Sequence, residues 1–311
     1  MLKVSYSGIR GIIGRDLTPE VAYGFTRALG AFLAETERAR PPRILLARDN
    51  RPSGPELRQA VLAATTTFPC EVWDLGVCST PTAQVACRAL DADVSLVITA
   101  SHNPREWNGF KYFLAPDCIV MDGPQIKRLF GYYQGLAGDM PAGLEAPSPR
   151  DASVQAFEAH RNGVLARVDA DRIRPLQFKV AVDFAGGAGA AVARAVLSAL
   201  GCEIVEVHSD REPEPSVDVL GPLCEAVVEN GCQFGAAQDM DGDRLVLVNE
   251  KGQARGEDFT LALAVRHLLE GLKEPGRAVV VKNSSTTAMI DDLCTKYGAQ
   301  LVETPVGEVN L

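Results

Sequence analysis

Two polar segments, far apart in the sequence, carry residue types suited to phosphoryl transfer. The first runs from Thr99 to Lys111, reads "TASHNPREWNGFK", and directly follows an apolar run. The second runs from Asp239 to Arg244, reads "DMDGDR", and follows a run of small residues. A serine hydroxyl can carry a phosphoryl group, and a set of carboxylates can hold the metal ion that offsets phosphate charge.

The second segment predicts a site for a hard divalent metal ion. Asp239, Asp241 and Asp243 alternate along the chain, and in extended backbone this spacing points three side chains the same way. Two carboxylates held ~4 Å apart repel by roughly 4 kcal/mol at an effective dielectric constant near 20, and a cation relieves that repulsion. Oxygen ligands alone favour Mg²⁺ or Ca²⁺ over Zn²⁺. The alternative is an acidic turn that is simply solvated.

An EF-hand calcium loop does not fit the same segment. Such a loop starting at Asp239 would place Glu250 at its twelfth position, as required. Its sixth position would be Arg244, where the EF-hand needs glycine, and strands instead of helices are expected on both sides. The metal that we expect is therefore Mg²⁺.

Ser101 is the candidate phosphoryl carrier of the first segment. It follows a predicted strand, and Lys111 and Arg244 could stabilise or protonate the transferring group. A polar turn in which Ser101 only caps a helix would explain that segment equally well by itself. The distant aspartates favour the phosphoryl carrier, because the metal ion they predict would offset the charge of a phosphate.

Three segments with the same order of elements are expected to position these residues. Each has a short apolar run, a polar turn, a helix-like stretch and a second apolar run, and they span 43–76, 178–208 and 277–306. Apolar strands joined by crossover helices predict an α/β fold, with mixed but mostly parallel sheets covered by helices. Ligands of such sheets bind at the carboxyl ends of the strands, so functional residues should follow strands.

Local signals place several boundaries. Thr18, Pro19 and Glu20 are typical of a helix start and predict a helix over 19–35. In the third repeat a helix is expected to start near Ser284. Pro- and Gly-rich linkers near 136–151 and 249–258 put domain boundaries near 145 and 252.

Composition excludes several classes of protein. With 311 residues the chain is long enough for two or three domains, and its net charge of −9 is unsuited to binding nucleic acid. It has no apolar run long enough for a membrane helix and no signal pattern, so we expect a cytoplasmic protein without a membrane partner. The eight cysteines form no Cys-x-x-Cys pair, which favours buried free thiols.

Taken together, "TASHNPREWNGFK" and "DMDGDR" resemble the α-D-phosphohexomutases, the family of phosphoglucomutase, phosphomannomutase and phosphoglucosamine mutase. Further matches are "SGIRGIIG" at 7–14, "ARDNRPSG" at 47–54, "GVCSTPT" at 76–82 and "TPVGE" at 304–308, so the resemblance covers nearly the whole chain.

The resemblance implies a role for each matching residue. Ser101 would be phosphorylated, and the phosphoserine would bind Mg²⁺ together with Asp239, Asp241 and Asp243. Asp49 and Arg51 would support the active-site loop. Arg10, Lys111 and Arg244 would line the site, with Lys111 as the general acid/base. His102 would lie beside the phosphoserine.

The resemblance also implies the reaction and the domain plan. Phosphoserine would convert hexose 6-phosphate to hexose 1-phosphate through a hexose bisphosphate intermediate. The family has four domains, so we expect domain 1 at 1–145, domain 2 at 146–252 and a partial domain 3 at 253–311, in a truncated chain without domain 4. The substrate could be a glucose, mannose or glucosamine phosphate. A phosphatase, or a sugar-phosphate-binding protein without mutase activity, are the alternatives, and the oligomeric state stays open.

Overall fold

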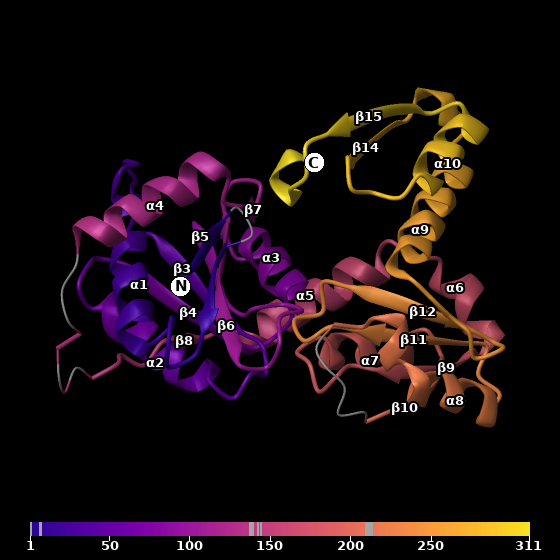
Figure 1. The fold of residues 1–311 in the computed structure, drawn as a ribbon, viewed down its shortest axis with the longest axis horizontal. Coiled ribbons are helices and arrows are strands. Elements are labelled where there is room, and N and C mark those ends of the chain that lie inside the picture. Colours follow the sequence, from indigo (N-terminus) through magenta and orange to yellow (C-terminus); the bar gives the residue numbers. More distant parts are fainter. Residues whose placement is uncertain (1, 6–7, 137–139, 142, 144, 209–213) are drawn as a thin grey trace.

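The chain folds into three α/β units that follow one another in sequence order (Figure 1). The computed structural model describes residues 2–5, 8–136, 140, 141, 143, 145–208 and 214–311. The first unit holds an eight-stranded sheet, the second a five-stranded sheet and the third a pair of strands. The predicted α/β fold with mixed sheets covered by helices is confirmed. Ser7, the first residue of one family match, lies outside the described residues.

The first sheet places the Ser101 segment at a strand edge. Its strand order is β1-β2-β6-β5-β3-β4-β8, with β7 paired to β6. The strands are β1 (Lys3–Ser5), β2 (Gly8–Ile12), β3 (Arg43–Arg48), β4 (Glu71–Val77), β5 (Val94–Ile98), β6 (Trp107–Leu114), β7 (Ile119–Val120) and β8 (Arg150–Asp151). Strand β3 is parallel to β4 and β5, whereas β6 is antiparallel to β5. Since Arg48 pairs with Ile98, the chain leaves β3 and β5 at the same edge.

Helices cover both faces of the first sheet. One face packs against α1 (Pro19–Ala34), α2 (Gly54–Thr65) and α4 (Gly123–Gly135), and the other against α3 (Thr80–Ala89) and α5 (Ser153–Leu165). Strand β3 contributes Ile44 and Leu46 to the first core and Leu45 and Ala47 to the second. Burial on both faces explains why its sequence is continuously apolar.

Helix α1 agrees with the predicted range of 19–35. Its N-cap is Thr18, whose side chain accepts a hydrogen bond from the backbone N–H of Val21, and Pro19 takes the first helical position. The helix ends one residue before the predicted boundary, at Ala34.

The segment that follows the predicted boundary near residue 145 contains β8 and α5, and both pack against the first unit. Strand β8 pairs with β4 through Trp73 and Arg150, and α5 packs against α3. The Arg150 guanidinium also lies 3.8 Å from the centroid of the Trp73 ring, a cation–π contact that favours this docking. Residues 150–165 therefore contact the first sheet, while α5 also contacts α7 (Ala190–Ala199) of the second unit, so this segment lies between the two units.

The second unit carries the aspartate segment. Its sheet has the order β10-β9-β11-β12-β13, parallel from β10 to β11 and antiparallel from β11 to β13. The strands are β9 (Lys179–Asp183), β10 (Glu203–Glu206), β11 (Phe234–Gln238), β12 (Leu245–Asn249) and β13 (Ala254–Arg255). Helix α7 (Ala190–Ala199) packs on one face and α8 (Gly221–Glu229) on the other, and the short α6 (Ala170–Ile173) precedes β9. Asp239 follows the carboxyl end of β11.

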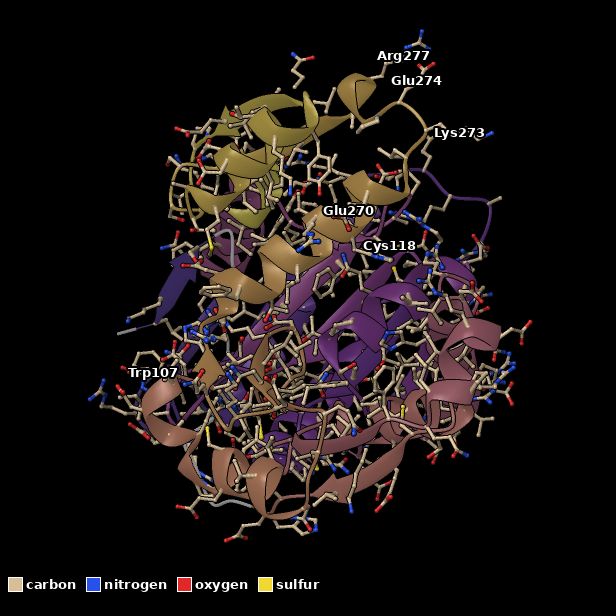
Figure 2. All side chains as sticks on the ribbon, turned by 90° about the vertical axis from the view of Figure 1, so that its right-hand side faces the viewer. Trp107, Cys118, Glu270, Lys273, Glu274 and Arg277 are labelled. Atoms are coloured by element: carbon tan, nitrogen blue, oxygen red, sulfur yellow. The ribbon has the colours of Figure 1, made fainter. Side chains whose placement is uncertain are left out.

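The third unit contains α9 (Glu257–Gly271), β14 (Val279–Asn283), α10 (Met289–Tyr297) and β15 (Gln300–Thr304). The turn between α9 and β14 presents Lys273, Glu274 and Arg277 at the end of the molecule away from Trp107 (Figure 2). The helix predicted to start near Ser284 begins at Met289 instead. Asn283 Oδ1 accepts hydrogen bonds from Ser285 N at 3.0 Å and Thr286 Oγ1 at 3.2 Å, so the intervening residues form a turn.

The cysteines agree with the prediction of free thiols. All eight are free, and Cys78, Cys87, Cys118, Cys232 and Cys294 are buried. Across the described ranges, none of the helices has both the length and the apolar character that crossing a membrane would require.

Candidate active site

Ser101 occupies a fixed position after β5. Its backbone φ is 52°, a left-handed conformation, and the residue is only 2% exposed. Its backbone N–H donates to Thr99 Oγ1 at 2.8 Å, and the Thr99 hydroxyl donates to Asp49 Oδ2 at 2.7 Å. Asp49 and Thr99 meet because they follow the parallel strands β3 and β5. A left-handed serine costs on the order of 1 kcal/mol and persists only where its surroundings hold it.

Arg51 is the side chain that holds the Ser101 loop. It is buried, and its Nε pairs with Asp49 Oδ2 at 3.1 Å. Its two terminal nitrogens donate to four backbone carbonyls of the loop: Ser101 at 2.7 Å, Asn103 at 2.7 Å, Pro104 at 2.8 Å and Trp107 at 2.9 Å. Asp49 and Arg51 thus lie against the backbone of the Ser101 loop.

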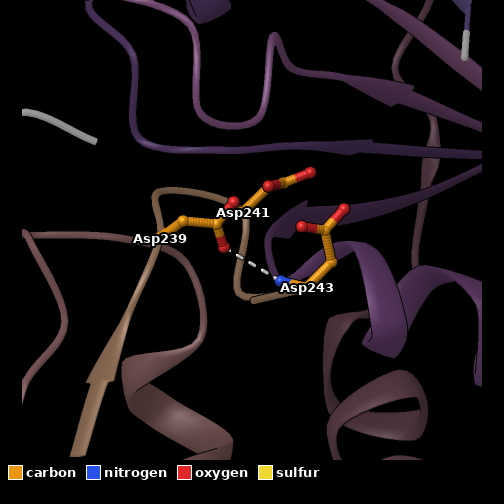
Figure 3. Close-up of side chains that lie close together, drawn as sticks. All are labelled: Asp239, Asp241 and Asp243. Atoms are coloured by element: carbon orange, nitrogen blue, oxygen red, sulfur yellow. Dashed lines mark hydrogen bonds between the residues drawn. The ribbon is translucent and has the colours of Figure 1, made fainter. Parts of the chain in front are cut away.

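The three aspartates converge through a turn. One carboxylate oxygen from each of Asp239, Asp241 and Asp243 lies within 4.8 Å of the others. Asp239 Oδ1 accepts hydrogen bonds from the backbone N–H of Asp243 at 3.0 Å (Figure 3) and of Arg244 at 3.2 Å. Gly242 has a φ of 71°. The cluster was predicted correctly, but the extended backbone assumed for it was wrong, because Gly242 turns the chain back onto Asp239.

The two segments, more than a hundred residues apart, meet in space. Ser101 Oγ lies 3.2 Å from Asp239 Oδ2 and 3.4 Å from Asp243 Oδ1. Lys111, on β6, places Nζ 2.8 Å from Asp241 Oδ2 and 2.5 Å from Asp243 Oδ2. A hydroxyl from the first unit and three carboxylates from the second therefore form a single site, with a lysine beside them.

Burial and mutual repulsion shape the charges of this cluster. Burial, with further contributions from Asp241 and Asp243, raises the pKa of Asp239 to about 9. Burial alone would also raise the pKa of Asp241, but the charge and hydrogen bond of Lys111 outweigh it, so that pKa is lowered. Burial alone would lower the pKa of Lys111, but the negative charges of Asp241 and Asp243 and their hydrogen bonds have the larger effect and raise it. Lys111 is therefore held as a cation by Asp241 and Asp243.

The carboxylates fit a hard cation. Asp241 Oδ2 accepts from Lys111 Nζ at 2.8 Å and from Thr80 Oγ1 at 2.6 Å. Asp241 Oδ1, in contrast, is buried and has no hydrogen-bond partner among the described residues. A buried carboxylate oxygen without a partner is costly unless a cation or another donor satisfies it. Together with the oxygens of Asp239 and Asp243, it forms a donor set of the kind that Mg²⁺ prefers.

The remaining predicted basic residues lie around the Ser101 loop. Arg10, on β2, donates from Nη1 to Asn103 Oδ1 at 2.7 Å. His102 Nδ1 is buried without a hydrogen-bond partner among the described residues. Burial, followed by the charges of Arg244 and Arg10, lowers the pKa of His102, so this imidazole is neutral near neutral pH.

Arg244 has different partners from those expected. Its Nη1 lies 3.2 Å from Glu214 Oε1 and 3.7 Å from Glu257 Oε1. Its backbone is part of the aspartate turn, but its guanidinium pairs with these glutamates and makes no recorded hydrogen bond to Ser101 in the described structure. Neither glutamate belongs to a motif, so these two partners of Arg244 could not be predicted.

Two contacts between the units were not predicted. Thr80 lies at the start of α3 and bonds to Asp241 through its hydroxyl at 2.6 Å and its backbone N–H at 2.8 Å. Asn50 Nδ2 donates to the backbone oxygen of Gly186 at 2.9 Å. The only sequence signal was position: Thr80 follows a strand within "GVCSTPT", and Asn50 adjoins Asp49.

Family models match most of the chain. Three models described as phosphoglucomutase/phosphomannomutase α/β/α domains I, II and III match residues 1–129, 158–252 and 256–311. The matches include the Ser101 segment in domain I and the aspartate segment in domain II.

Named relatives and a solved structure agree with these models. A "Phosphoglucomutase/phosphomannomutase" of Thermococcus kodakarensis is 33% identical over 97% of this chain and 66% of its own length. A "Phosphoglucosamine mutase" of Salinispora arenicola is 33% identical over 97% of this chain and 67% of its own. A crystal structure of a phosphoglucomutase/phosphomannomutase family protein from Burkholderia thailandensis superposes with a TM-score of 0.77 at 26% identity, covering 98% of this chain and 67% of that one. The chain thus spans about two thirds of the length of these proteins.

Proposed function

Because the chain belongs to the phosphoglucomutase/phosphomannomutase family, we propose that it acts in Mg²⁺-dependent phosphoryl transfer between hexose 6-phosphate and hexose 1-phosphate. Ser101 is the residue that carries the phosphoryl group, and a hexose bisphosphate is the intermediate. The observation that supports this most directly is the approach of Ser101 Oγ to Asp239 and Asp243, at 3.2 and 3.4 Å.

The metal ion has an evident place in this proposal. Asp239, Asp241 and Asp243, together with the phosphate on Ser101, would hold Mg²⁺, which offsets the negative charge of the transferring group. The carboxylate oxygen of Asp241 that lacks a partner supports this assignment.

The protein's own residues supply the proton transfers. When the phosphoryl group leaves Ser101, the bond from Oγ to phosphorus breaks and a bond from phosphorus to the sugar hydroxyl oxygen forms. Lys111 protonates Oγ as it leaves and then takes up the proton that the sugar hydroxyl loses. Lys111 starts charged because Asp241 and Asp243 raise its pKa, and a cation bound by the same two carboxylates would weaken their hold on the proton and so favour its transfer. The reverse sequence returns the other phosphate of the bisphosphate to Ser101.

The basic side chains around the loop would bind the phosphates. Arg10 and His102 flank the serine, and Arg51 keeps its loop in place, so Arg10 is available to a phosphate that displaces its bond to Asn103. Arg244 would have to exchange Glu214 and Glu257 for phosphate. In both cases the arginine would give up a contact with a protein side chain and form a charge-assisted hydrogen bond to a phosphate group of the substrate instead.

The sugar is a second part of the proposal. Relatives of similar identity are named for glucose and mannose phosphates or for glucosamine phosphate, so a glucosamine phosphate is the alternative substrate. The residues of the described site would bind the phosphate and the metal ion. Both are needed for the reaction of any of these sugar phosphates, so the site does not distinguish between them.

A phosphoenzyme experiment tests the proposal. The purified chain is incubated with glucose 1,6-bisphosphate and Mg²⁺, and the phosphorylated residue is found by intact-mass analysis and peptide mapping. We expect one phosphoryl group on Ser101, none in Ser101→Ala, and normal labelling in Ser95→Ala, a matched change at another buried serine, whose hydroxyl donates to the backbone oxygen of Ala83. Adding the 1-phosphate of glucose, mannose or glucosamine should then remove the label, fastest for the true substrate. Binding of a sugar phosphate without any labelling would identify a binding protein instead.

A further inference from the structure

The first turn of α3 reaches from the first unit to the metal-binding turn of the second. Ser79 caps the helix by accepting a hydrogen bond from the backbone N–H of Thr82. The next residue, Thr80, has a backbone N–H that is unpaired within the helix, as the first N–H groups of any helix are. It donates to the backbone oxygen of Asp241 at 2.8 Å, and the Thr80 hydroxyl donates to Asp241 Oδ2 at 2.6 Å.

These bonds determine which oxygen of Asp241 stays free. Oδ2 accepts from both Thr80 Oγ1 and Lys111 Nζ, whereas Oδ1 is buried and has no partner among the described residues. Two donors on one oxygen, from different directions of the first unit, restrict the rotation of the carboxylate. Both donors are themselves buried, since Thr80 is 4% exposed and Lys111 is 7% exposed.

We propose that Thr80 is a positioning residue of the metal site, whose hydroxyl orients Asp241 so that Oδ1 remains available to the cation. The inference rests on the metal site of the proposed function. Thr80 does not touch the metal or the substrate in this account and acts only through Asp241. Because Thr80 belongs to the first unit and Asp241 to the second, the same bond also fixes the distance between the metal ligands and Ser101.

A hydroxyl side chain such as that of Thr80 suits this task. A hydroxyl donates one hydrogen bond and carries no charge, so it leaves the negative charge of Asp241 to the metal. A second lysine or arginine would compete with the cation. Valine has nearly the same shape but no donor, which makes it an informative replacement.

The test compares variants of Thr80 with a control on the same helical turn. Thr82 is also buried, but its hydroxyl bonds to Ser79 Oγ and His160 Nδ1, each at 2.8 Å, instead of to Asp241. Binding of Mn²⁺ is measured by isothermal titration calorimetry and by the decrease in the electron paramagnetic resonance signal of unbound Mn²⁺. Thermal unfolding is measured with and without Mn²⁺. Thr80→Val should bind Mn²⁺ about tenfold more weakly, as expected for the loss of a hydrogen bond to a charged group.

Two further variants separate positioning from folding. Thr80→Ser keeps the donor and should bind Mn²⁺ within about threefold of the unmodified chain. Thr82→Val should lower the unfolding temperature without changing Mn²⁺ affinity. If Thr80→Val does not fold, Thr80→Ala makes the same comparison with less steric change.

The outcomes distinguish this inference from the proposed function. Unchanged Mn²⁺ affinity in the Thr80 variant that lacks the hydroxyl, or an equal loss in Thr82→Val, would overturn the positioning role while leaving the metal site intact. If the unmodified chain bound no Mn²⁺, the metal site and the inference would both fail.

Discussion

Replacing Arg51 with methionine is expected to release the Ser101 loop from the first sheet. The Arg51 side chain is buried, and its guanidinium bonds to Asp49 and to the backbone oxygens of Ser101, Asn103, Pro104 and Trp107. Methionine has a similar length and can fill much of the same volume, but it donates no hydrogen bond.

The size of the effect follows from the groups left behind. Breaking a buried ion pair by removing one partner costs about 3–5 kcal/mol, because Asp49 would keep an uncompensated charge. Each backbone oxygen left buried without a donor would add about 1–3 kcal/mol. The loop can move to let water reach those oxygens, so we expect a total loss of about 4–6 kcal/mol in the free energy of unfolding of the first unit. Because domain stabilities are typically about 5–15 kcal/mol, the variant should be close to unfolding.

Tryptophan fluorescence can report this unit alone. The chain has two tryptophans, Trp73 on β4 and Trp107 on β6, and both lie in the first sheet. Urea unfolding followed by fluorescence therefore measures the unit that Arg51 stabilises. Arg48→Met is the matched control, because among the described residues the Arg48 side chain donates one hydrogen bond, to the backbone oxygen of Asp49 at 3.1 Å. We expect that control to lose no more than about 1 kcal/mol.

A second readout follows the loop itself. Phosphorylation of Ser101 by glucose 1,6-bisphosphate should be slower in Arg51→Met and unchanged in Arg48→Met. Arg51→Lys should lie between Arg51→Met and the unmodified chain, because it restores the charge beside Asp49 but cannot bond to four carbonyls at once. If Arg51→Met unfolded within about 1 kcal/mol of the unmodified chain, the account of this arginine as the support of the loop would be wrong.

Three further predictions concern the metal turn and the contact between the units. Asp241→Asn should weaken Mn²⁺ binding at least about tenfold, because one anionic ligand becomes neutral and Lys111 loses a counter-charge; an unchanged titration curve would indicate a plain acidic turn. Gly242→Ala should cost about 1–2 kcal/mol in urea unfolding and also weaken Mn²⁺ binding, because φ is +71° and the added methyl group would lie 3.1 Å from Ser79 Cβ; full stability would contradict the turn geometry. Burial lowers the pKa of His160 below 6.5, so the unfolded chain binds the proton first and stability should fall as the pH drops below that value. His160→Gln should reduce this slope in the pH dependence of the unfolding temperature, and an identical slope would exclude His160 as its source.

The parts of the fold that depend on neighbouring residues were predictable from sequence. Helix α1 begins where Thr18 and Pro19 place it, since capping and a fixed proline φ act within one turn. Strand β3 is continuously apolar because helices cover both of its faces, and this pattern was legible in the sequence. The start of α10 was predicted wrongly because Asn283 Oδ1 accepts hydrogen bonds from Ser285 and Thr286, which form a turn before the helix. Composition alone does not show whether such residues form a turn or the first turn of a helix.

The residue types that could perform the chemistry were already visible in the sequence: a serine and a lysine in one segment, three aspartates in another, and Asp49 and Arg51 in a motif of their own. Three contacts became known from the three-dimensional fold: Ser101 lies 3.2 Å from Asp239, Thr80 bonds to Asp241, and Arg244 pairs with glutamates. The reason is physical. Spacing along the chain specifies local backbone geometry, whereas these contacts join two separately folded sheets, and their distances depend on how the helices and turns between those sheets pack.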